Sequence, residues 1–223
     1  MTSKVTPVRE KSGSVYVQGY IHQPAVPNGD ALVFTHGAGG NSDSTLLKIL
    51  GDTFAGAGYL FLRCDLPFRH DRRTGPPRPG DAARDREGLE AALHLLRPQI
   101  AGRLFLGGQS YGGRQATMLL ADKPELAGGL VLTSYPLHPP GKPTQLRTQH
   151  FPKLHTPALF VEGSRDPFAS MEEMQAALKL IPARTAMITI SGGGHDLIGR
   201  KASAAGEIAQ NILNAFQSFF TNG

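Results

Sequence analysis

The chain has 223 residues, of which 40% are hydrophobic, with one cysteine and a formal net charge of +5. This length suffices for one sizeable core, so we expect a single domain over residues 1–223. The only cysteine, Cys64, excludes an internal disulfide and a cysteine-based metal cluster.

Hydropathy and charge also limit the partners. No apolar stretch reaches the roughly 20 residues that cross a bilayer, and the opening MTSKVTPVREKSGS contains no apolar segment typical of a secretory signal. We therefore expect a cytoplasmic protein without a membrane partner. The small basic surplus is typical of a solvated surface, so nucleic acid is not the expected partner.

Seven short segments are predicted to be strands. Residues 14–21 alternate like a half-buried strand, and the other six are continuous apolar runs, typical of parallel strands covered on both faces. These six are residues 31–36, 59–64, 103–108, 129–134, 157–163 and 185–190.

Helical patterns occupy the intervals between these strands. Apolar residues recur at helical spacing within 46–54, 89–96, 118–119 and 171–178, and a stripe from Ile208 to Phe220 predicts a C-terminal helix. Ser170 and Glu173 fit a capping box, and Pro182 marks the end of that helix. The alternation predicts an α/β fold, a mostly parallel sheet with helices on both faces.

Two stretches rich in proline and basic residues interrupt this alternation. They are residues 66–81 and 135–157. Each follows the C-terminal end of a predicted strand, the edge at which open α/β sheets bind ligands. We interpret both as walls of a site, and the second as a short cap-like loop.

Residues 107–113 read GGQSYGG and lie between a predicted strand and a predicted helix. Gly108-Gln109-Ser110-Tyr111-Gly112 matches the G-x-S-x-G turn, which projects a serine hydroxyl above the edge of a sheet. The glycines leave room for that turn. Ser110 is therefore the candidate nucleophile.

A serine nucleophile needs a histidine base that a carboxylate orients. Of eight histidines, only His195 follows the last predicted strand, in the glycine-rich loop SGGGHD. No Asp or Glu occurs from Leu126 to Val161, so Asp166 in SRDPF is the best acid. The nearby Glu162 is placed in or at the edge of a strand. The alternatives are that His195 is an exposed loop residue and that Asp166 only forms a turn, neither with a catalytic role.

The oxyanion of an acyl transfer needs two N–H donors. One is the backbone N–H of Tyr111, which follows the nucleophile. The other should come from the loop HGAGG after the strand 31–36, from Ala38 or, alternatively, Gly39. We interpret His36 in that loop as a structural hydrogen-bonding residue.

With HGAGG, GQSYGG, SRDPF and GGGHD in this order, the chain resembles the α/β-hydrolase superfamily from about Val15 to Phe220. It is most similar to the small, nearly lidless group of dienelactone-hydrolase-like proteins. The resemblance implies an α/β-hydrolase fold with a minimal lid and hydrolysis of a carboxylic ester or thioester through an acyl-serine, without metal or cofactor. Ser110 stands where true dienelactone hydrolases carry a cysteine.

Two questions stay open at this point. A catalytically inactive scaffold of the same fold is the alternative to a small-molecule hydrolase. The basic residues of the two irregular stretches are either solvated or bind an anionic ester, and Arg72 and Arg73 are the substrate-binding candidates. The residues concerned are Arg69, Arg72, Arg73, Arg78, Lys142, Arg147 and Lys153.

Overall fold

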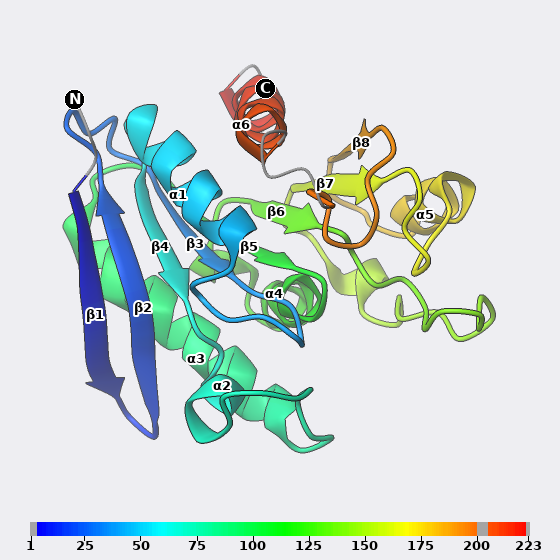
Figure 1. The fold of residues 1–223 in the computed structure, drawn as a ribbon, viewed down its shortest axis with the longest axis horizontal. Helices are drawn as coiled ribbons and strands as arrows, with labels where there is room; N and C mark the ends of the chain where they lie inside the picture. Colours follow the sequence, from blue (N-terminus) through cyan, green and yellow to red (C-terminus); the bar gives the residue numbers. More distant parts are fainter. Residues whose placement is uncertain (1–3, 200–204, 222–223) are drawn as a thin grey trace.

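The computed structural model describes residues 4–199 and 205–221, whose strands form one eight-stranded sheet (Figure 1). The strand order is β1-β2-β4-β3-β5-β6-β7-β8. β1 and β2 pair antiparallel with their neighbours, and every later pair is parallel. The strands are β1 Lys4–Ser12, β2 Val15–Gln23, β3 Ala31–Thr35, β4 Leu60–Cys64, β5 Leu104–Gln109, β6 Leu130–Thr133, β7 Ala158–Gly163 and β8 Thr185–Ile190.

Helices cover both faces of this sheet, and α1 and α3 lie on opposite faces (Figure 1). The α-helices within the described ranges are α1 Thr45–Gly56, α2 Pro67–Asp71, α3 Asp81–Leu96, α4 Tyr111–Asp122, α5 Met171–Leu178 and α6 Ala205–Thr221. None of these helices is long and apolar enough to cross a membrane.

The sheet separates two apolar cores. In β3, Ala31 and Val33 belong to the core shared with α3, α4 and α5, whereas Leu32 and Phe34 belong to the core under α1 and α6. Every residue of β3 is buried. Burying one large apolar side chain stabilises the fold by roughly 1.5–3 kcal/mol, which is why the central strands are apolar on both faces.

The predicted fold class is confirmed. All seven predicted strands are present, each within two residues of its predicted bounds. The predicted capping box also forms: Glu173 N–H donates to Ser170 Oγ, and the Glu173 carboxylate accepts from Ser170 N–H. The helix it begins ends at Leu178, before Pro182.

Two elements were not predicted. β1 is charged, contains a proline and is mostly exposed, and it is held by an antiparallel register with β2 along its whole length. α2 is a five-residue helix within the proline-rich stretch 66–81. The other irregular stretch, 135–157, contains one short 3-10 helix, Phe151–Lys153, and no α-helix.

Candidate active site

Ser110 forms the turn between β5 and α4. Its φ of 50° and ψ of −115° lie in a region that side chains rarely adopt, at a cost of about 1–3 kcal/mol. Two backbone hydrogen bonds hold the turn: Ser110 N–H donates to Thr133 O, and Arg114 N–H donates to Ser110 O, each over 2.9 Å. The turn carries the Ser110 side chain to the carboxyl edge of the sheet.

The glycines around Ser110 are required by close backbone contacts. A Cβ on Gly108 would lie 2.6 Å from Gly113 N, and a Cβ on Gly112 would lie 2.5 Å from His36 O. Gly113 N belongs to α4 and His36 O to the start of the HGAGG loop, so either added methyl group would meet backbone. Strand, helix and the HGAGG loop therefore approach one another only because these side chains are absent.

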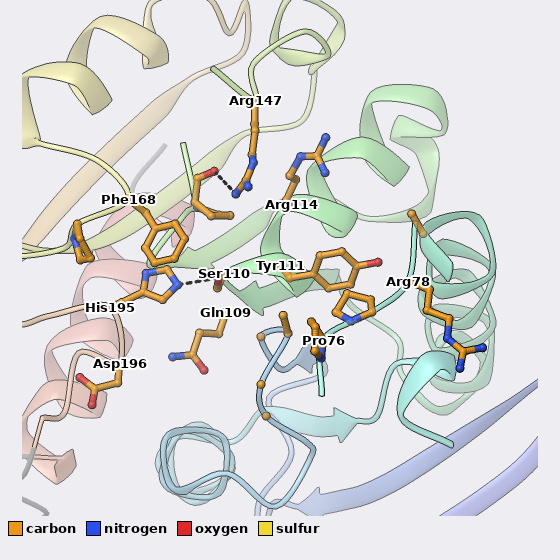
Figure 2. Close-up of a pocket in the computed structure, with 18 of the residues that line it drawn as sticks. Pro76, Arg78, Gln109, Ser110, Tyr111, Arg114, Arg147, Phe168, His195 and Asp196 are labelled. Carbon is orange, nitrogen blue, oxygen red and sulfur yellow. Dashed lines mark hydrogen bonds between the residues drawn. The ribbon is translucent and has the colours of Figure 1, made fainter. Parts of the chain in front are cut away.

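The side chains of Ser110, His195 and Asp166 form one hydrogen-bonded chain. His195 Nε2 lies 2.7 Å from Ser110 Oγ (Figure 2), and His195 Nδ1 lies 2.8 Å from Asp166 Oδ2. The second carboxylate oxygen accepts a 2.8 Å hydrogen bond from Phe168 N–H. Three residues far apart in the sequence therefore meet at one edge of the sheet.

Two contacts orient the imidazole of His195. An ionised carboxylate only accepts hydrogen bonds, so Asp166 places the ring proton on Nδ1 and leaves the lone pair of Nε2 facing the Ser110 hydroxyl. The Phe168 ring stacks on the imidazole with ring centroids 4.0 Å apart and an interplanar angle of 25°. The arrangement suits a base that takes the serine proton.

The loops after β7 and β8 are paired, which brings Asp166 and His195 together. Arg165 N–H donates to Gly193 O over 2.8 Å, and Gly192 N–H donates to Ser164 Oγ over 2.8 Å. A Cβ on Gly163 would lie 2.4 Å from Gly193 O, so the two loops pack backbone to backbone.

Glu162, the other acidic residue near this edge, lies inside β7 and is fully buried. Its Oε1 accepts from Tyr135 N–H over 2.9 Å, and its Oε2 has no partner within the described residues. Burial raises the pKa of this carboxyl well above its usual range, with a further contribution from the charge of Asp166. Glu162 does not contact His195 in this geometry.

The HGAGG loop lies against Ser110: a Cβ on Gly37 would be 3.3 Å from Ser110 Cβ. Arg69 of α2 holds the loop from the other side, donating to Ala38 O and to Gly40 O, each over 2.8 Å. Within residues 4–199 and 205–221, the backbone N–H groups of Ala38 and Tyr111 have no acceptor. Both residues line the cavity beside Ser110.

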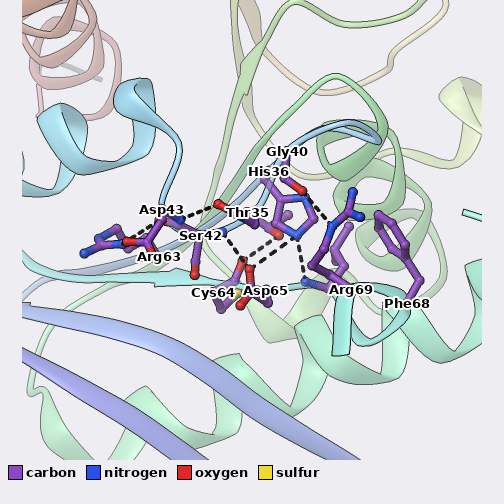
Figure 3. A network of polar contacts seen from close by, with 12 residues as sticks. Thr35, His36, Gly40, Ser42, Asp43, Arg63, Cys64, Asp65, Phe68 and Arg69 are labelled. Carbon is purple, nitrogen blue, oxygen red and sulfur yellow. Dashed lines mark hydrogen bonds and ion pairs between the residues drawn. The ribbon is translucent and has the colours of Figure 1, made fainter. Parts of the chain in front are cut away.

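Figure 3 shows the polar network beneath this loop. His36 Nδ1 donates to Gly37 O over 2.8 Å, and its Nε2 accepts from Leu66 N–H over 3.1 Å. These partners require the neutral ring, and burial lowers the pKa of His36 to about 4. Its role is structural, as expected from the sequence.

The same network includes Arg63 of β4, a buried arginine. Its guanidinium donates to Ser42 O over 2.6 Å and to Asp43 Oδ1 over 3.0 Å (Figure 3), and to His22 Nε2 over 2.9 Å. These contacts support the chain just after the HGAGG loop. Cys64 is buried beside them, and burial raises the pKa of its thiol to about 12, which makes it a poor nucleophile.

A cavity of about 1010 Å³ opens over Ser110 and His195 (Figure 2). Both irregular stretches contribute to its wall, the first through residues 76–79 and the second through Pro136 and Arg147. Phe168 and the prolines make much of the lining apolar. The described part of the chain contains no group of three His, Cys, Asp or Glu side chains arranged to hold a metal.

Two of the basic residues named from the sequence, Arg78 and Arg147, line the cavity, whereas the two substrate-binding candidates do not. Arg72 and Arg73 do not line it: Arg72 forms an ion pair with Asp81 over 2.7 Å, and Arg73 is exposed. We therefore withdraw both as substrate-binding candidates. The lining arginines are Arg78, Arg114 and Arg147.

Arg114 is the residue that sequence reasoning missed. It lies in the first turn of α4, four residues after Ser110, and residues at that spacing lie on the same face of a helix. The predicted helix after Ser110 therefore contained the necessary signal.

Comparisons with known proteins agree with this architecture. The structure is similar to a dienelactone hydrolase from Anabaena variabilis, with 20% identity, a TM-score of 0.79 and coverage of 98% of this chain and 99% of that chain. It is also similar to an alpha-beta serine hydrolase homologue from Coxiella burnetii (17% identity, TM-score 0.73, coverage 92% and 96%) and to Est1E from Butyrivibrio proteoclasticus (14%, 0.72, 94% and 98%). At these identities the similarity shows a shared fold.

The family model for an alpha/beta hydrolase domain matches residues 28–221. That match extends over the HGAGG loop, the turn at Ser110 and the loops of Asp166 and His195. The chain therefore belongs to the α/β-hydrolase family.

Proposed function

We propose that this protein is a serine hydrolase that cleaves a carboxylic ester or thioester of a small molecule through an acyl-serine intermediate. The observation that carries the proposal is the chain of hydrogen bonds from Ser110 Oγ through His195 to Asp166. A hydroxyl becomes a useful nucleophile when a base with this orientation removes its proton.

In the first half of the reaction, His195 Nε2 takes the Ser110 proton while Oγ attacks the carbonyl carbon of the ester. The carbonyl oxygen becomes an oxyanion, and the N–H groups of Tyr111 and Ala38 donate to it; each such donor contributes about 10²–10³ in rate. The imidazolium, stabilised by Asp166, then gives its proton to the departing alcohol or thiol.

In the second half, a water molecule replaces the leaving group. His195 removes a proton from that water, which attacks the acyl carbon, and the same two N–H groups stabilise the second oxyanion. When the Ser110–acyl bond breaks, the proton returns from His195 to Ser110 Oγ and the free acid is released. No group outside this set is needed to balance the protons.

The direct test is labelling with a fluorophosphonate followed by peptide mapping. Tryptic cleavage after Arg103 and Arg114 yields LFLGGQSYGGR, a peptide in which Ser110 is the only serine. We expect the label on this peptide, and we expect Ser110→Ala to abolish labelling and to lower turnover on 4-nitrophenyl butanoate by about 10⁶.

Ser134→Ala is a matched control, because Ser134 follows the neighbouring strand β6 at the same edge and, like Ser110, has a positive φ, 52°. This variant should be labelled normally. A folded wild-type protein that takes no label and hydrolyses no ester would favour the inactive scaffold instead. Full esterase activity in Ser110→Ala would show that another group is the nucleophile.

A further inference from the structure

Two arginines lie close together in the cavity wall beside Ser110. Arg114 comes from the first turn of α4 and Arg147 from the stretch between β6 and β7. Figure 2 shows both guanidinium groups on the same side of the Ser110–His195 pair, whereas the guanidinium of Arg78 points away from it. The two therefore define one end of the cavity.

Neither guanidinium forms an ion pair with a carboxylate within residues 4–199 and 205–221. The arginines that form ion pairs in the described ranges are Arg63, Arg72, Arg84 and Arg103. The residues outside these ranges contain no Asp or Glu. Asp85, on the adjacent helix α3, accepts from Phe68 N–H and Tyr111 O–H instead. The charge at this end of the cavity is not compensated by a carboxylate of the described chain.

The hydrogen-bond donors of both side chains are also largely unused within the described ranges. The Arg114 side chain donates no hydrogen bond there, and its Nε is buried without a partner. Arg147 donates one, to Pro136 O over 3.3 Å. Arginine presents five N–H donors in a planar fork, so most of the donors remain for a ligand.

The position of Arg114 is electrostatically unfavourable in the unliganded protein. The N-terminus of α4 carries a partial positive charge, and that first turn contains no acidic residue. Arg114 adds a full positive charge there. Burial, and then the proximity of Arg114, lower the pKa of the Arg147 guanidinium. A bound anion would relieve the repulsion among all three positive groups.

We propose that Arg114 and Arg147 form a subsite for an anionic group, a carboxylate or a phosphate, carried by the ester substrate. This inference rests on the proposed hydrolase activity and specifies its substrate class. The apolar wall made by Phe168 and the prolines accommodates the body of the substrate, and the two guanidinium forks bind its charged end.

The test compares charged and neutral esters of the same shape. One pair places the charge on the acyl side, 4-nitrophenyl hydrogen adipate against 4-nitrophenyl methyl adipate. The other pair places it on the alcohol side, 4-(butanoyloxy)benzoate against its methyl ester. We expect kcat/KM to favour the charged member of one pair by about 10- to 100-fold at 0.05 M salt, and less at 0.5 M.

Substitutions then locate the subsite. Arg114→Gln and Arg147→Gln should each bring the charged-to-neutral ratio of kcat/KM close to 1. The matched control is Arg73→Gln, which removes the same charge from an exposed residue outside the cavity and should keep the wild-type ratio. If the charged-to-neutral ratio of kcat/KM falls equally in Arg73→Gln, the preference comes from long-range attraction and the subsite proposal is wrong.

An inhibition assay distinguishes the two anionic groups. Hexanoate, hexyl phosphate and hexanol share one alkyl chain, and their inhibition of 4-nitrophenyl butanoate hydrolysis compares carboxylate, phosphate and neutral ends. The stronger of the two anions identifies the group. If both inhibit no better than hexanol and neither ester pair shows a preference, the subsite is disproved, whereas the hydrolase proposal stands as long as Ser110 is labelled.

Discussion

Asp166 and Glu162 lie four residues apart at the end of β7, and their surroundings give them different properties. Asp166 accepts hydrogen bonds from His195 Nδ1 and Phe168 N–H, so its negative charge is satisfied. Glu162 is fully buried with one unpartnered oxygen, and burial raises its pKa. Burial disfavours the charged form of the Glu162 carboxyl, which is the form that stabilises an imidazolium.

This difference predicts opposite outcomes for two isosteric substitutions. Asp166→Asn should lower kcat/KM for 4-nitrophenyl butanoate by about 10⁴, because the amide neither fixes the tautomer of His195 nor stabilises its charged form. Glu162→Gln leaves the hydrogen bond between His195 and Asp166 intact and should change kcat/KM by less than about threefold. Both are measured beside an unfolding curve. The reverse pattern would make Glu162 the acid.

Residues of the candidate site differed in how far the sequence alone could locate them. Ser110 was predictable because the turn needs glycines at fixed offsets and a strand and a helix on either side. Arg72 and Arg73 were misplaced because a loop sequence carries no period from which the direction of a side chain follows. The direction of the Arg72 side chain depends on its ion pair with Asp81, and Arg72 does not line the cavity.

At the scale of elements, the candidate site depends on contacts between backbones. The turn at Ser110, the start of α4 and the HGAGG loop approach one another at Gly112, where a Cβ would meet His36 O at 2.5 Å. Arg69 fixes the far side of the loop. The loop can therefore not retreat from an added methyl group without breaking these hydrogen bonds.

Gly112→Ala should consequently destabilise the fold by about 1–3 kcal/mol or more and slow fluorophosphonate labelling of Ser110. Gly56→Ala is the matched control: Gly56 ends α1, and a Cβ there would meet no atom within 4 Å. It should leave labelling unchanged and, by restricting the unfolded chain, raise stability slightly. Thermal unfolding and labelling rates compare the two. Equal behaviour of both variants would contradict the packing argument.

The elements that the sequence did not reveal have a common physical cause. β3 and β5 bury side chains on both faces, and so their apolar runs are readable from composition. β1 buries almost nothing, and its conformation comes from backbone hydrogen bonds to β2, which any sequence can make. α2 is a single turn packed by Phe68, too short to show a helical period.

At the scale of the molecule, parallel topology assembles the candidate site. β3, β5, β7 and β8 all end at the same edge, which brings the HGAGG loop, Ser110, Asp166 and His195 within reach of one another. The order of the motifs along the chain therefore predicted that these residues lie near one another. Arg78 and Arg147 lie in the two stretches that the sequence predicts as walls, and Arg114 follows from the helix after Ser110. The ion pair between Arg72 and Asp81 depends on side-chain conformation, and for that reason the absence of Arg72 from the wall was not predictable.

Glu162 also makes a testable contribution to the stability of the whole molecule. Its pKa is raised by folding, so its stabilising contribution is complete below the unfolded-state pKa near 4.3 and is lost as pH rises from there toward the folded-state pKa. Across this window the free energy of unfolding should fall by about 1.4 kcal/mol per pH unit on account of this residue alone. Glutamine at position 162 does not ionise, so this fall in the free energy of unfolding is absent from Glu162→Gln.

The measurement is the difference in unfolding free energy between Glu162→Gln and the wild type, from urea titrations at pH 5, 6, 7 and 8. Titrating groups that do not interact with Glu162, including His36, whose burial lowers its pKa to about 4, cancel in this difference. The difference should grow in favour of Glu162→Gln as pH rises. A difference independent of pH would mean that Glu162 titrates alike in both states and that its unpartnered oxygen has found a donor. In that case folding does not raise the pKa of Glu162, and the proposed difference between Glu162 and Asp166 is wrong.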